Sequence, residues 1–338
     1  MATKQLEKYI ESTNIARELD EDTLKKIGDD VVRGFDVDIQ SRSEWERNVD
    51  NWIDLAKLVS EKKTYPWPGA ANIKYPLLAT AAMQFAARAY PSLIPSNNNV
   101  VKCRVVGSDP DGQKADRAKR ISKYMSYQVM DEMPDWEEEM DKLLITLPIV
   151  GTCFKKTYWD SERSVNCSKL IPPKQLVINY WAKSVEDAER ITEWFPLSER
   201  KLKEKQLADL YLDITLQEPS AIYEPGRQIG TSDLRVPEED ETTPYYILEQ
   251  HTYLDLDKDG YAEPYIVTVE YGSKKVLRIV ARYTANGIVL NEDNKLCRIE
   301  PVEYYTKFPF IPNPDGSIYD LGFGRLLCPI NESVNTLL

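Results

Sequence analysis

The chain has 338 residues, of which 42% are hydrophobic and 29% charged, a composition typical of a soluble globular protein. Its formal net charge of −12 at pH 7 argues against a surface that holds nucleic acid by counterion release, which needs a clear basic patch. The five cysteines lack CxxC spacing, which indicates neither a disulfide framework nor a zinc site and fits a reducing cytoplasm. The sequence has no signal peptide at its start and no apolar stretch of about 18 residues that could span a membrane.

The first 63 residues are predicted to be helical and polar. Asp20 is a helix start signal, Gly34 is expected to break the helix, and residues 41–44 read as a capping box before a second helix. Trp45 and Trp52 lie at heptad spacing on that second helix, which favours a place in the core over a platform for stacking nucleic-acid bases.

Three more helices and one strand are expected before residue 150. Apolar spacing and bounding prolines predict a helix over 77–90, and alternation predicts a strand over 100–106. Helices over 114–130 and 135–147 follow. The first of these carries a basic run, formed by Lys114, Arg117, Lys119, Arg120 and Lys123. We interpret this run as a solvated face offset by nearby acids, with a phosphate backbone or an acidic neighbouring subunit as functional alternatives.

The middle of the chain is predicted to be β-rich. Strands of one sheet are expected over 151–159 and 169–180, and a short capped helix begins at 197. Residues 216–244 read as a loop. Further strands are predicted over 245–253, 265–271 and 276–280, with hairpin turns at 259–260, 272–273 and 286–287. Helices first and a largely antiparallel sheet later predict an α+β fold, divided into a mainly helical part (1–150), a β-rich part (151–320) and a final helix (321–338).

The final helix carries an apolar stripe on one face. The stripe has three- and four-residue spacing and comprises Leu326, Leu327, Ile330, Val334, Leu337 and Leu338. No C-cap glycine, cationic last turn or proline follows, so we expect the helix to continue in a longer protein and to pack against other copies of the chain. Asn331, Glu332 and Asn335 are then expected to face a channel or solvent.

The motif with the strongest metal-like spacing is Asp255-Leu-Asp-Lys-Asp-Gly260. Asp255, Asp257 and Asp259 alternate before a glycine, as at the start of a calcium loop. The twelfth position of such a loop would be Ile266, which cannot bind a metal. We therefore favour an acidic hairpin turn that needs no metal, and keep calcium as the less favoured alternative.

No pattern in the chain predicts catalysis or a cofactor. His251, the one histidine, lies inside a predicted strand without a nucleophile motif near it, which favours a structural role. The sequence contains no G-x-S-x-G, H-E-x-x-H, P-loop or dinucleotide-binding motif. We therefore expect no enzymatic activity.

The order of several short motifs resembles the portal proteins of tailed double-stranded DNA bacteriophages, particularly the P22-like portals of short-tailed phages. Each motif is weak alone, and together they span residue 43 to the end. In chain order they are Ser43-Glu-Trp45 with Trp52, Lys74-Tyr-Pro-Leu-Leu, Gln84-Phe-Ala-Ala-Arg-Ala-Tyr-Pro91, residues 150–160, Ile178-Asn-Tyr-Trp-Ala-Lys-Ser-Val-Glu-Asp-Ala188, residues 253–264, Phe308-Pro-Phe, and Gly322-Phe-Gly-Arg through Asn335-Thr-Leu.

The resemblance implies a head-to-tail connector of the virion, assembled in the host cytoplasm as a homododecameric ring at one capsid vertex. It implies a channel through which the terminase packages the viral genome and through which the genome is later ejected. Residues 1–320 would form the wing and 321–338 the start of the stem helix, with the rest of the stem, the clip and any crown beyond. The implied partners are other copies of the chain, the major capsid protein, the terminase large subunit, tail adaptor proteins and double-stranded DNA that passes without sequence-specific binding. It implies no cofactor and no membrane.

Two functions from other classes remain as alternatives. The first is a divalent-metal-dependent nuclease that uses acids such as Asp255, Asp257 and Asp259, although the sequence offers no basic groove for its substrate. The second is a calcium-stabilised structural or adhesion module built on the same three acids.

Overall fold

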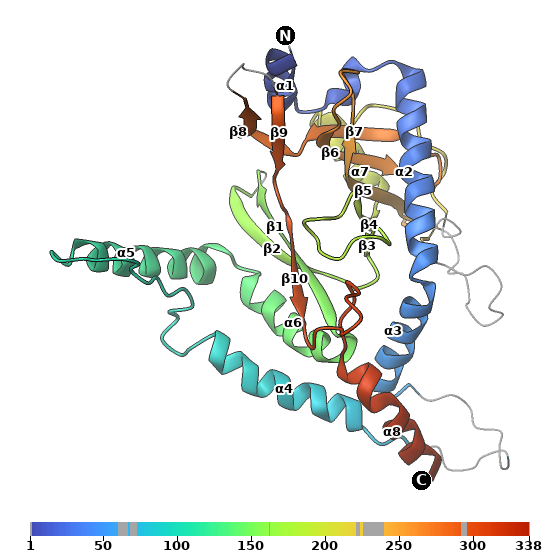
Figure 1. Cartoon of the computed structure of the whole chain (residues 1–338). Helices are drawn as coiled ribbons and strands as arrows, with labels where there is room; N and C mark the ends of the chain where they lie inside the picture. Colours follow the sequence, from blue (N-terminus) through green and yellow to red (C-terminus); the bar gives the residue numbers. More distant parts are fainter. Residues whose placement is uncertain are drawn as a thin grey trace. The chain divides into compact units, whose positions relative to one another are not determined.

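The computed structural model describes residues 2–59, 67, 73–161, 163–220, 224–225, 240–291 and 296–337, with side chains from Leu6 onward. Its helices and antiparallel sheets confirm the predicted α+β fold (Figure 1). The chain forms two compact units: unit 1 comprises Met1–Glu44 and Lys174–Glu303, and unit 2 comprises Trp45–Pro173 and Tyr304–Leu338. These units differ from the predicted division at residues 150 and 320, because each is built from two segments that are distant in sequence.

Unit 1 is organised around an antiparallel sheet with the strand order β3-β4-β5-β6-β7. The strands are β3 (Leu176–Ile178), β4 (Ile191–Leu197), β5 (Tyr245–Leu254), β6 (Glu263–Glu270) and β7 (Val276–Ala281). The β5–β6 and β6–β7 connections contain the predicted turns at 259–260 and 272–273, which confirms both hairpins.

The turn predicted at 286–287 is wrong. Asn286 and Gly287 lie inside β8 (Tyr283–Leu290), which pairs with β9 (Leu296–Pro301) with a register shift between Tyr283 and Ile288. A Cβ atom on Gly287 would lie 2.8 Å from the Glu300 carbonyl oxygen, so this glycine permits close approach of two strands and does not form a hairpin turn.

Helices pack on the sheet of unit 1 and bury its apolar residues. α1 (Ala2–Glu11), the 3₁₀ helix η1 (Ile15–Glu18) and α2 (Glu21–Ser41) contribute to one core cluster with β5, β6 and β7. A second cluster joins α7 (Glu199–Leu207) to Ile247 and Leu277. Tyr246 and Leu248 belong to the first cluster and Ile247 to the second, so alternate residues of β5 are buried on both faces of the sheet.

The beginning of α2 is as predicted, but its expected break is wrong. The Asp20 carboxylate accepts a hydrogen bond from the Thr23 backbone N–H at 2.9 Å and caps the helix. The helix then continues through Gly34 to Ser41. A Cβ atom on Gly34 would lie 3.2 Å from Arg190 Nε, so the missing side chain allows Arg190 to pack closely against the helix. The capping box predicted at 41–44 is also absent, since Ser41 ends α2 and its hydroxyl donates to the Asp38 carbonyl.

Unit 2 contains an antiparallel sheet with the order β10-β1-β2, formed by β1 (Thr152–Asp160), β2 (Val165–Ile171) and β10 (Tyr305–Pro309). The predicted strand over 169–180 is wrong as a single element. Pro172 and Pro173, which carry no N–H, separate β2 from β3, and the two strands belong to different sheets.

Four helices of unit 2 pack around two apolar clusters. The helices in these clusters are α3 (Ser43–Ala56), α4 (Leu77–Leu93), α6 (Trp136–Val150) and α8 (Phe323–Leu337). Unit 2 also contains α5 (Gln113–Tyr127), followed by a π-helical turn η2 (Gln128–Glu132), and neither contributes to the two clusters. Trp52 is 7% exposed and packs with Val49 and Leu78, and Trp45 stacks on Tyr319 with ring centroids 4.2 Å apart. Both tryptophans therefore contribute to packing, as predicted.

The strand predicted over 100–106 is wrong. This segment is irregular and runs beside α5, where Val101 donates its N–H to Ser126 Oγ at 3.0 Å and accepts from the Ser122 hydroxyl. Two serines of α5 therefore satisfy backbone groups that a neighbouring strand would otherwise satisfy. In the part of the chain that the structure describes, no helix is both long and apolar enough to cross a membrane.

Candidate functional site

The α8 helix packs through a face different from its apolar stripe. Its buried positions are Gly324 and Asn331. A Cβ atom on Gly324 would lie 2.5 Å from Trp52 Cγ and from the Ile149 carbonyl oxygen, so the glycine allows α8 to approach α3 and α6 closely. Leu326, Ile330 and Leu337 are instead 46%, 55% and 87% exposed.

The expectation that Asn331 faces a channel or solvent is wrong, because this residue is fully buried, whereas Asn335 is half-buried. Asn331 Oδ1 accepts a hydrogen bond from Leu78 N–H at 3.2 Å, and its Nδ2 donates to the Tyr75 carbonyl at 3.0 Å. Asn335 Oδ1 accepts from Tyr75 N–H at 2.7 Å. The N-cap residue of α4, Pro76, makes no side-chain hydrogen bond to the helix. The two asparagines of α8 therefore supply hydrogen-bond partners for the backbone groups at the start of α4. Glu332 is exposed, as expected.

The predicted stripe therefore divides into two parts. Leu327 and Val334 are half-buried, and Leu338 lies outside the described residues. The exposed Leu326, Ile330 and Leu337 occur at intervals of four and seven residues and share one side of the helix, which we call the outer face of α8. Three large apolar side chains aligned on one helix face are suited to an interface.

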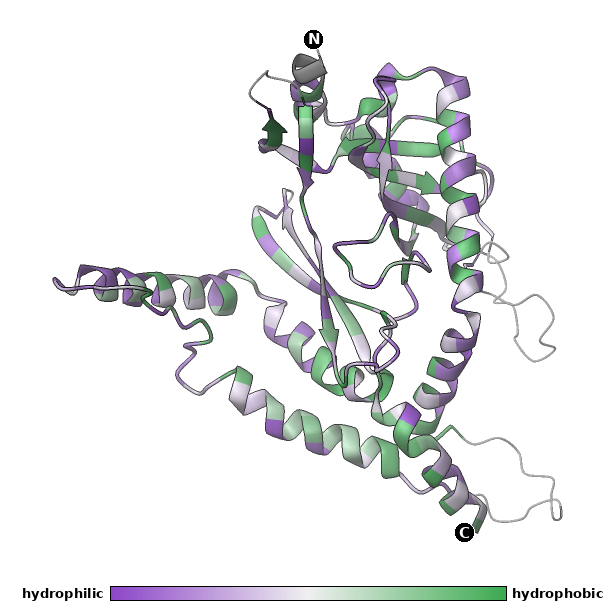
Figure 2. Cartoon of the chain, in the orientation of Figure 1, coloured by the Kyte–Doolittle hydropathy of each residue, from purple (hydrophilic) through white to green (hydrophobic). Residues whose placement is uncertain are grey.

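The predicted basic helix corresponds to α5, and most of its residues are exposed to solvent. Together with the irregular residues 99–112 beside it, it forms what we call the α5 arm (Figure 1). Its apolar residues Ile121, Tyr124 and Met125 are 39%, 58% and 43% exposed. Figure 2 shows hydrophilic and hydrophobic residues interleaved along this helix. An exposed helix with both kinds of side chain can contact a partner through both.

All five residues of the predicted basic run, Lys114, Arg117, Lys119, Arg120 and Lys123, are exposed. Lys114 Nζ donates to the Ser108 carbonyl at 3.0 Å. Among the described residues, neither Arg117 nor Arg120 forms an ion pair, whereas Lys119 lies 3.9 Å from Asp116. The arm thus presents positive charge on a chain whose net charge is −12.

Unit 2 has an acidic groove between α4 and α6, which the sequence did not predict. It has a volume of about 620 Å³ and is lined by Ala86, Ala87, Tyr90, Pro134, Glu137, Glu138 and Asp141. The Tyr90 hydroxyl donates to the Glu137 carboxylate, and this hydrogen bond raises the pKa of Tyr90. Because the acids come from one helix and the tyrosine from another, no local pattern reveals the groove.

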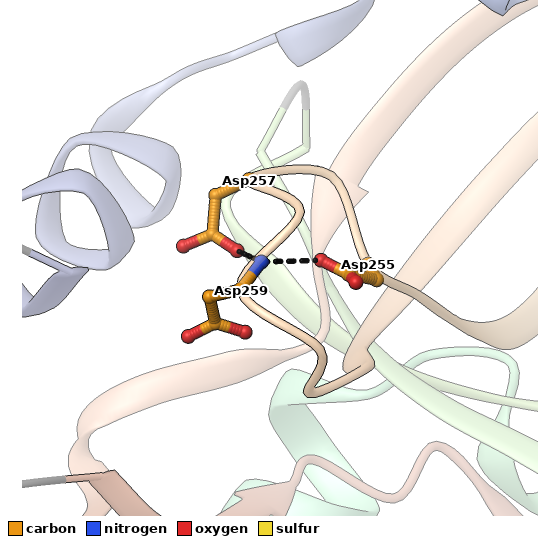
Figure 3. Close-up of side chains that lie close together, drawn as sticks. All are labelled: Asp255, Asp257 and Asp259. Carbon is orange, nitrogen blue, oxygen red and sulfur yellow. Dashed lines mark hydrogen bonds between the residues drawn. The ribbon is translucent and has the colours of Figure 1, made fainter.

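The three predicted metal-binding acids lie together in the β5–β6 turn (Figure 3). One potential ligand atom from each of Asp255, Asp257 and Asp259 lies within 4.8 Å of the other two. The Asp259 N–H donates to Asp255 Oδ1 at 3.2 Å and to Asp257 Oδ1 at 3.3 Å, as the dashed lines in Figure 3 mark. Burial and the two neighbouring carboxylates raise the pKa of Asp257. Gly260 has a φ of +93°, which glycine adopts readily.

The environment of His251 is that of the sheet interior. This histidine is 2% exposed, pairs with Ile191 and Ile266 across the neighbouring strands, and has its Nε2 atom 3.8 Å from Glu249 Oε1. A buried imidazole in a central strand contributes to the packing of the sheet.

Lys155 is a buried charge in β1 of unit 2. It is 2% exposed, and its Nζ atom has no hydrogen-bond partner among the described residues, although it lies 5.6 Å from the centre of the Trp136 ring. Burial lowers the pKa of Lys155 to about 8, against the opposing effect of Glu139. The amino group of Lys155 therefore binds its proton less tightly in the folded protein than in the unfolded chain.

We expect Lys155→Met to stabilise the protein at pH 7. The folded-state pKa lies below the unfolded value, so the lysine destabilises the fold below pH 8 and the penalty disappears as pH rises toward 10.5. The free energy of unfolding should increase by about 1–3 kcal/mol at pH 7, a gain that already allows for the lost contact with Trp136. The gain should vanish near pH 10.5. Urea unfolding across this pH range measures it. Lys307→Met removes the ion-pair partner of buried Asp320, whose carboxylate lies 2.7 Å from Lys307 Nζ, so this contrasting variant should destabilise the protein.

Comparison with protein-family models and with curated proteins finds no match to the chain.

Proposed function

We propose that the chain is a subunit of a portal ring, the channel at one vertex of a bacteriophage capsid. In this proposal copies of the chain assemble, as a homododecamer in the family that it resembles, and the ring passes double-stranded DNA during packaging and ejection. The order of the sequence motifs from residue 43 onward supports the family, and the exposed surfaces of unit 2 support the assembly. The proposal places the protein in the virion, after assembly in the host cytoplasm.

The observation that carries the proposal is the opposite charge of two surfaces on the same unit. The α5 arm presents Arg117 and Arg120, and the groove between α4 and α6 presents Glu137, Glu138 and Asp141. A contact between different surfaces of identical subunits is heterologous, and such contacts close into a ring when the rotation between subunits allows it. The arm of one copy in the groove of the next would pair these charges and cover Tyr124 and Met125.

The outer face of α8 would provide a second contact in the ring. Leu326, Ile330 and Leu337 are exposed in the single chain, and burial against neighbouring copies would remove their apolar surface from water. Leu327 and Val334 contribute less to such a contact, because the fold of unit 2 already half-covers them. This assigns the oligomer interface to fewer residues than the sequence pattern does.

The remaining partners follow from the family that the sequence resembles. They are the major capsid protein, the terminase large subunit and tail adaptor proteins. A protein with a net charge of −12 would repel the phosphate backbone, and DNA would then move through the channel without sequence-specific binding. The chain would carry out no reaction on DNA or nucleotides.

A charge-reversal series tests the contact between the arm and the groove. We expect Arg117→Glu with Arg120→Glu to weaken self-association at least about tenfold, because close charge pairs across interfaces are coupled by about 1.5 kcal/mol or more. Glu138→Arg with Asp141→Arg should do the same. Combining all four changes restores opposite charges and should recover much of the association. Sedimentation velocity at low and high salt measures each variant.

The matched control is Lys25→Glu with Lys26→Glu, which changes net charge by the same amount as the arm variant on exposed residues of α2. If this control weakens association as much as the arm variant, net charge and not the specific contact is responsible. Failure of the fourfold variant to recover would contradict the pairing of arm and groove.

A further inference from the structure

Unit 1 contains a cavity of about 350 Å³ between α2 and β5. Its apolar wall includes Ile27, Val31 and Val37 from α2 and Leu254 from β5. Val31 is 3% exposed, whereas Val37 is 55% exposed and lies at the mouth of the cavity. The volume is at the small end of the range for pockets that bind ligands, which suits a single apolar side chain.

The side chain of Gln250 lines this cavity and has an unused acceptor. Gln250 is 3% exposed, and its Nε2 atom donates to Thr192 Oγ1 at 2.8 Å and lies 3.5 Å from the Val31 carbonyl oxygen. Its Oε1 atom accepts no hydrogen bond from the described residues. A buried amide oxygen without a partner is unfavourable, so a ligand with an N–H group would satisfy it.

Arg190 lines the same cavity and has unused donors. Its Nε and Nη2 atoms donate to the buried Asp38 carboxylate, with Nη2 at 2.8 Å from Asp38 Oδ1. The guanidinium lies against Gly34, where a Cβ atom would be 3.3 Å from Arg190 Nη1. Among the described residues this Nη1 atom has no hydrogen-bond partner, so its two N–H groups can donate to a ligand.

The charges at the cavity balance one another. Arg190 is paired with Asp38, and Arg33 is paired with Asp30, whose Oδ1 atom lies 2.6 Å from Arg33 Nη2. A charged ligand would therefore meet no uncompensated opposite charge. The cavity instead offers an acceptor, donors and an apolar wall, which together complement an uncharged amide group that carries an apolar side chain.

We propose that this cavity binds an extended, uncharged peptide segment of a partner protein through one apolar side chain. A peptide N–H of the segment donates to Gln250 Oε1, a peptide carbonyl accepts from Arg190 Nη1, and the side chain lies against Val31, Val37 and Leu254. Main-chain hydrogen bonds then supply affinity and the pocket supplies specificity. Val37 and the 77% exposed side chain of Arg33 let the bound chain continue into solvent.

The site belongs to unit 1 alone. All of its residues lie in the segments Met1–Glu44 and Lys174–Glu303, whereas the α5 arm, the acidic groove and the outer face of α8 belong to unit 2. The proposal therefore does not depend on ring assembly, and its failure would leave the portal proposal as it stands.

Saturation-transfer difference NMR on the full chain tests the proposal with acetyl-leucine amide, a minimal probe of this chemistry. We expect saturable binding of this probe. Acetyl-glycine amide, which lacks the apolar side chain, and acetyl-leucine, whose carboxylate brings a charge into the cavity, should each bind at least about tenfold more weakly. A capped tetrapeptide with one leucine among alanines should bind at least as tightly as acetyl-leucine amide.

Two variants of the chain test the site itself. Val37→Trp should weaken binding of acetyl-leucine amide by about tenfold or more, because the larger side chain fills the mouth of the cavity. Val59→Trp is the matched control at a residue of unit 2 that is 50% exposed, and it should leave binding unchanged. Gln250→Met removes the acceptor at similar length and should weaken binding about tenfold, with thermal unfolding measured on the same sample.

Absence of acetyl-leucine amide binding, or binding that Val37→Trp leaves unchanged, would overturn the site. Because Val37 is exposed, this variant remains decisive if Gln250→Met does not fold. Binding of acetyl-leucine as tight as that of its amide would overturn the assignment to an uncharged ligand. Failure of the tetrapeptide to bind would overturn the assignment to a peptide segment.

Discussion

Gly151→Ala should destabilise unit 2 by about 3–5 kcal/mol, as expected when backbone strain and overpacking coincide. Gly151 ends α6 with a φ of +96°, and its N–H donates to the Leu147 carbonyl at 2.8 Å. An added Cβ atom would lie 2.4 Å from the Asp320 carbonyl oxygen and 2.5 Å from the Gly322 nitrogen. Backbone atoms cannot rotate away as a side chain can, so the chain itself would have to move.

Gly316→Ala separates the two causes of this effect. Gly316 also has a positive φ, +73°, but a Cβ atom there would meet nothing within 4 Å. The control should cost only about 1 kcal/mol, the conformational penalty alone. Urea unfolding followed by circular dichroism compares the two variants. Equal losses for both would contradict the close approach of residues 320–322 to Gly151.

We expect Asn331→Leu to destabilise unit 2 by about 2–4 kcal/mol, although the substitution preserves volume and adds apolar surface. The amide of Asn331 bonds Leu78 N–H and the Tyr75 carbonyl, and leucine would leave both of these groups without their partner. Asn335→Ala, which removes one bond at a less buried position, should cost about 1 kcal/mol.

The same unfolding measurement distinguishes the two views of α8. If Asn331 faced a channel, Asn331→Leu would be neutral or would increase self-association without a loss of stability. A large loss of stability, with Asn335→Ala intermediate, supports the role of α8 as the cap of α4.

Features that depend on neighbouring residues were predictable from the sequence. The cap of α2 at Asp20 depends on a side chain and the backbone three residues later, and the hairpin turns at 259–260 and 272–273 join consecutive strands. The core positions of Trp52 and Val49 follow from helical spacing. The α+β class follows from the order of such local patterns.

Features that depend on distant segments were not predictable. Gly34 reads as a helix break until Arg190 is known to lie beside it, and Gly287 reads as a turn until Glu300 is known to approach it. The alternating residues 100–106 bond to serines of α5 in place of a strand. The role of Asn331 depends on α4, more than 200 residues earlier in the chain.

The candidate sites show the same distinction. The spacing of Asp255, Asp257 and Asp259 predicted the acidic turn in which the three carboxylates lie together. The acidic groove that could receive the α5 arm combines residues from α4 and α6, and it has no signal in either helix alone.

Negative-stain electron microscopy of the purified 338-residue chain tests the central proposal most directly. We expect class averages of closed rings with a central opening, and we expect that charge reversal at Arg117 and Arg120 reduces the fraction of particles in rings. A chain that remains monomeric at its highest soluble concentration, or that forms only symmetric pairs, would contradict assembly through the α5 arm, the acidic groove and the outer face of α8.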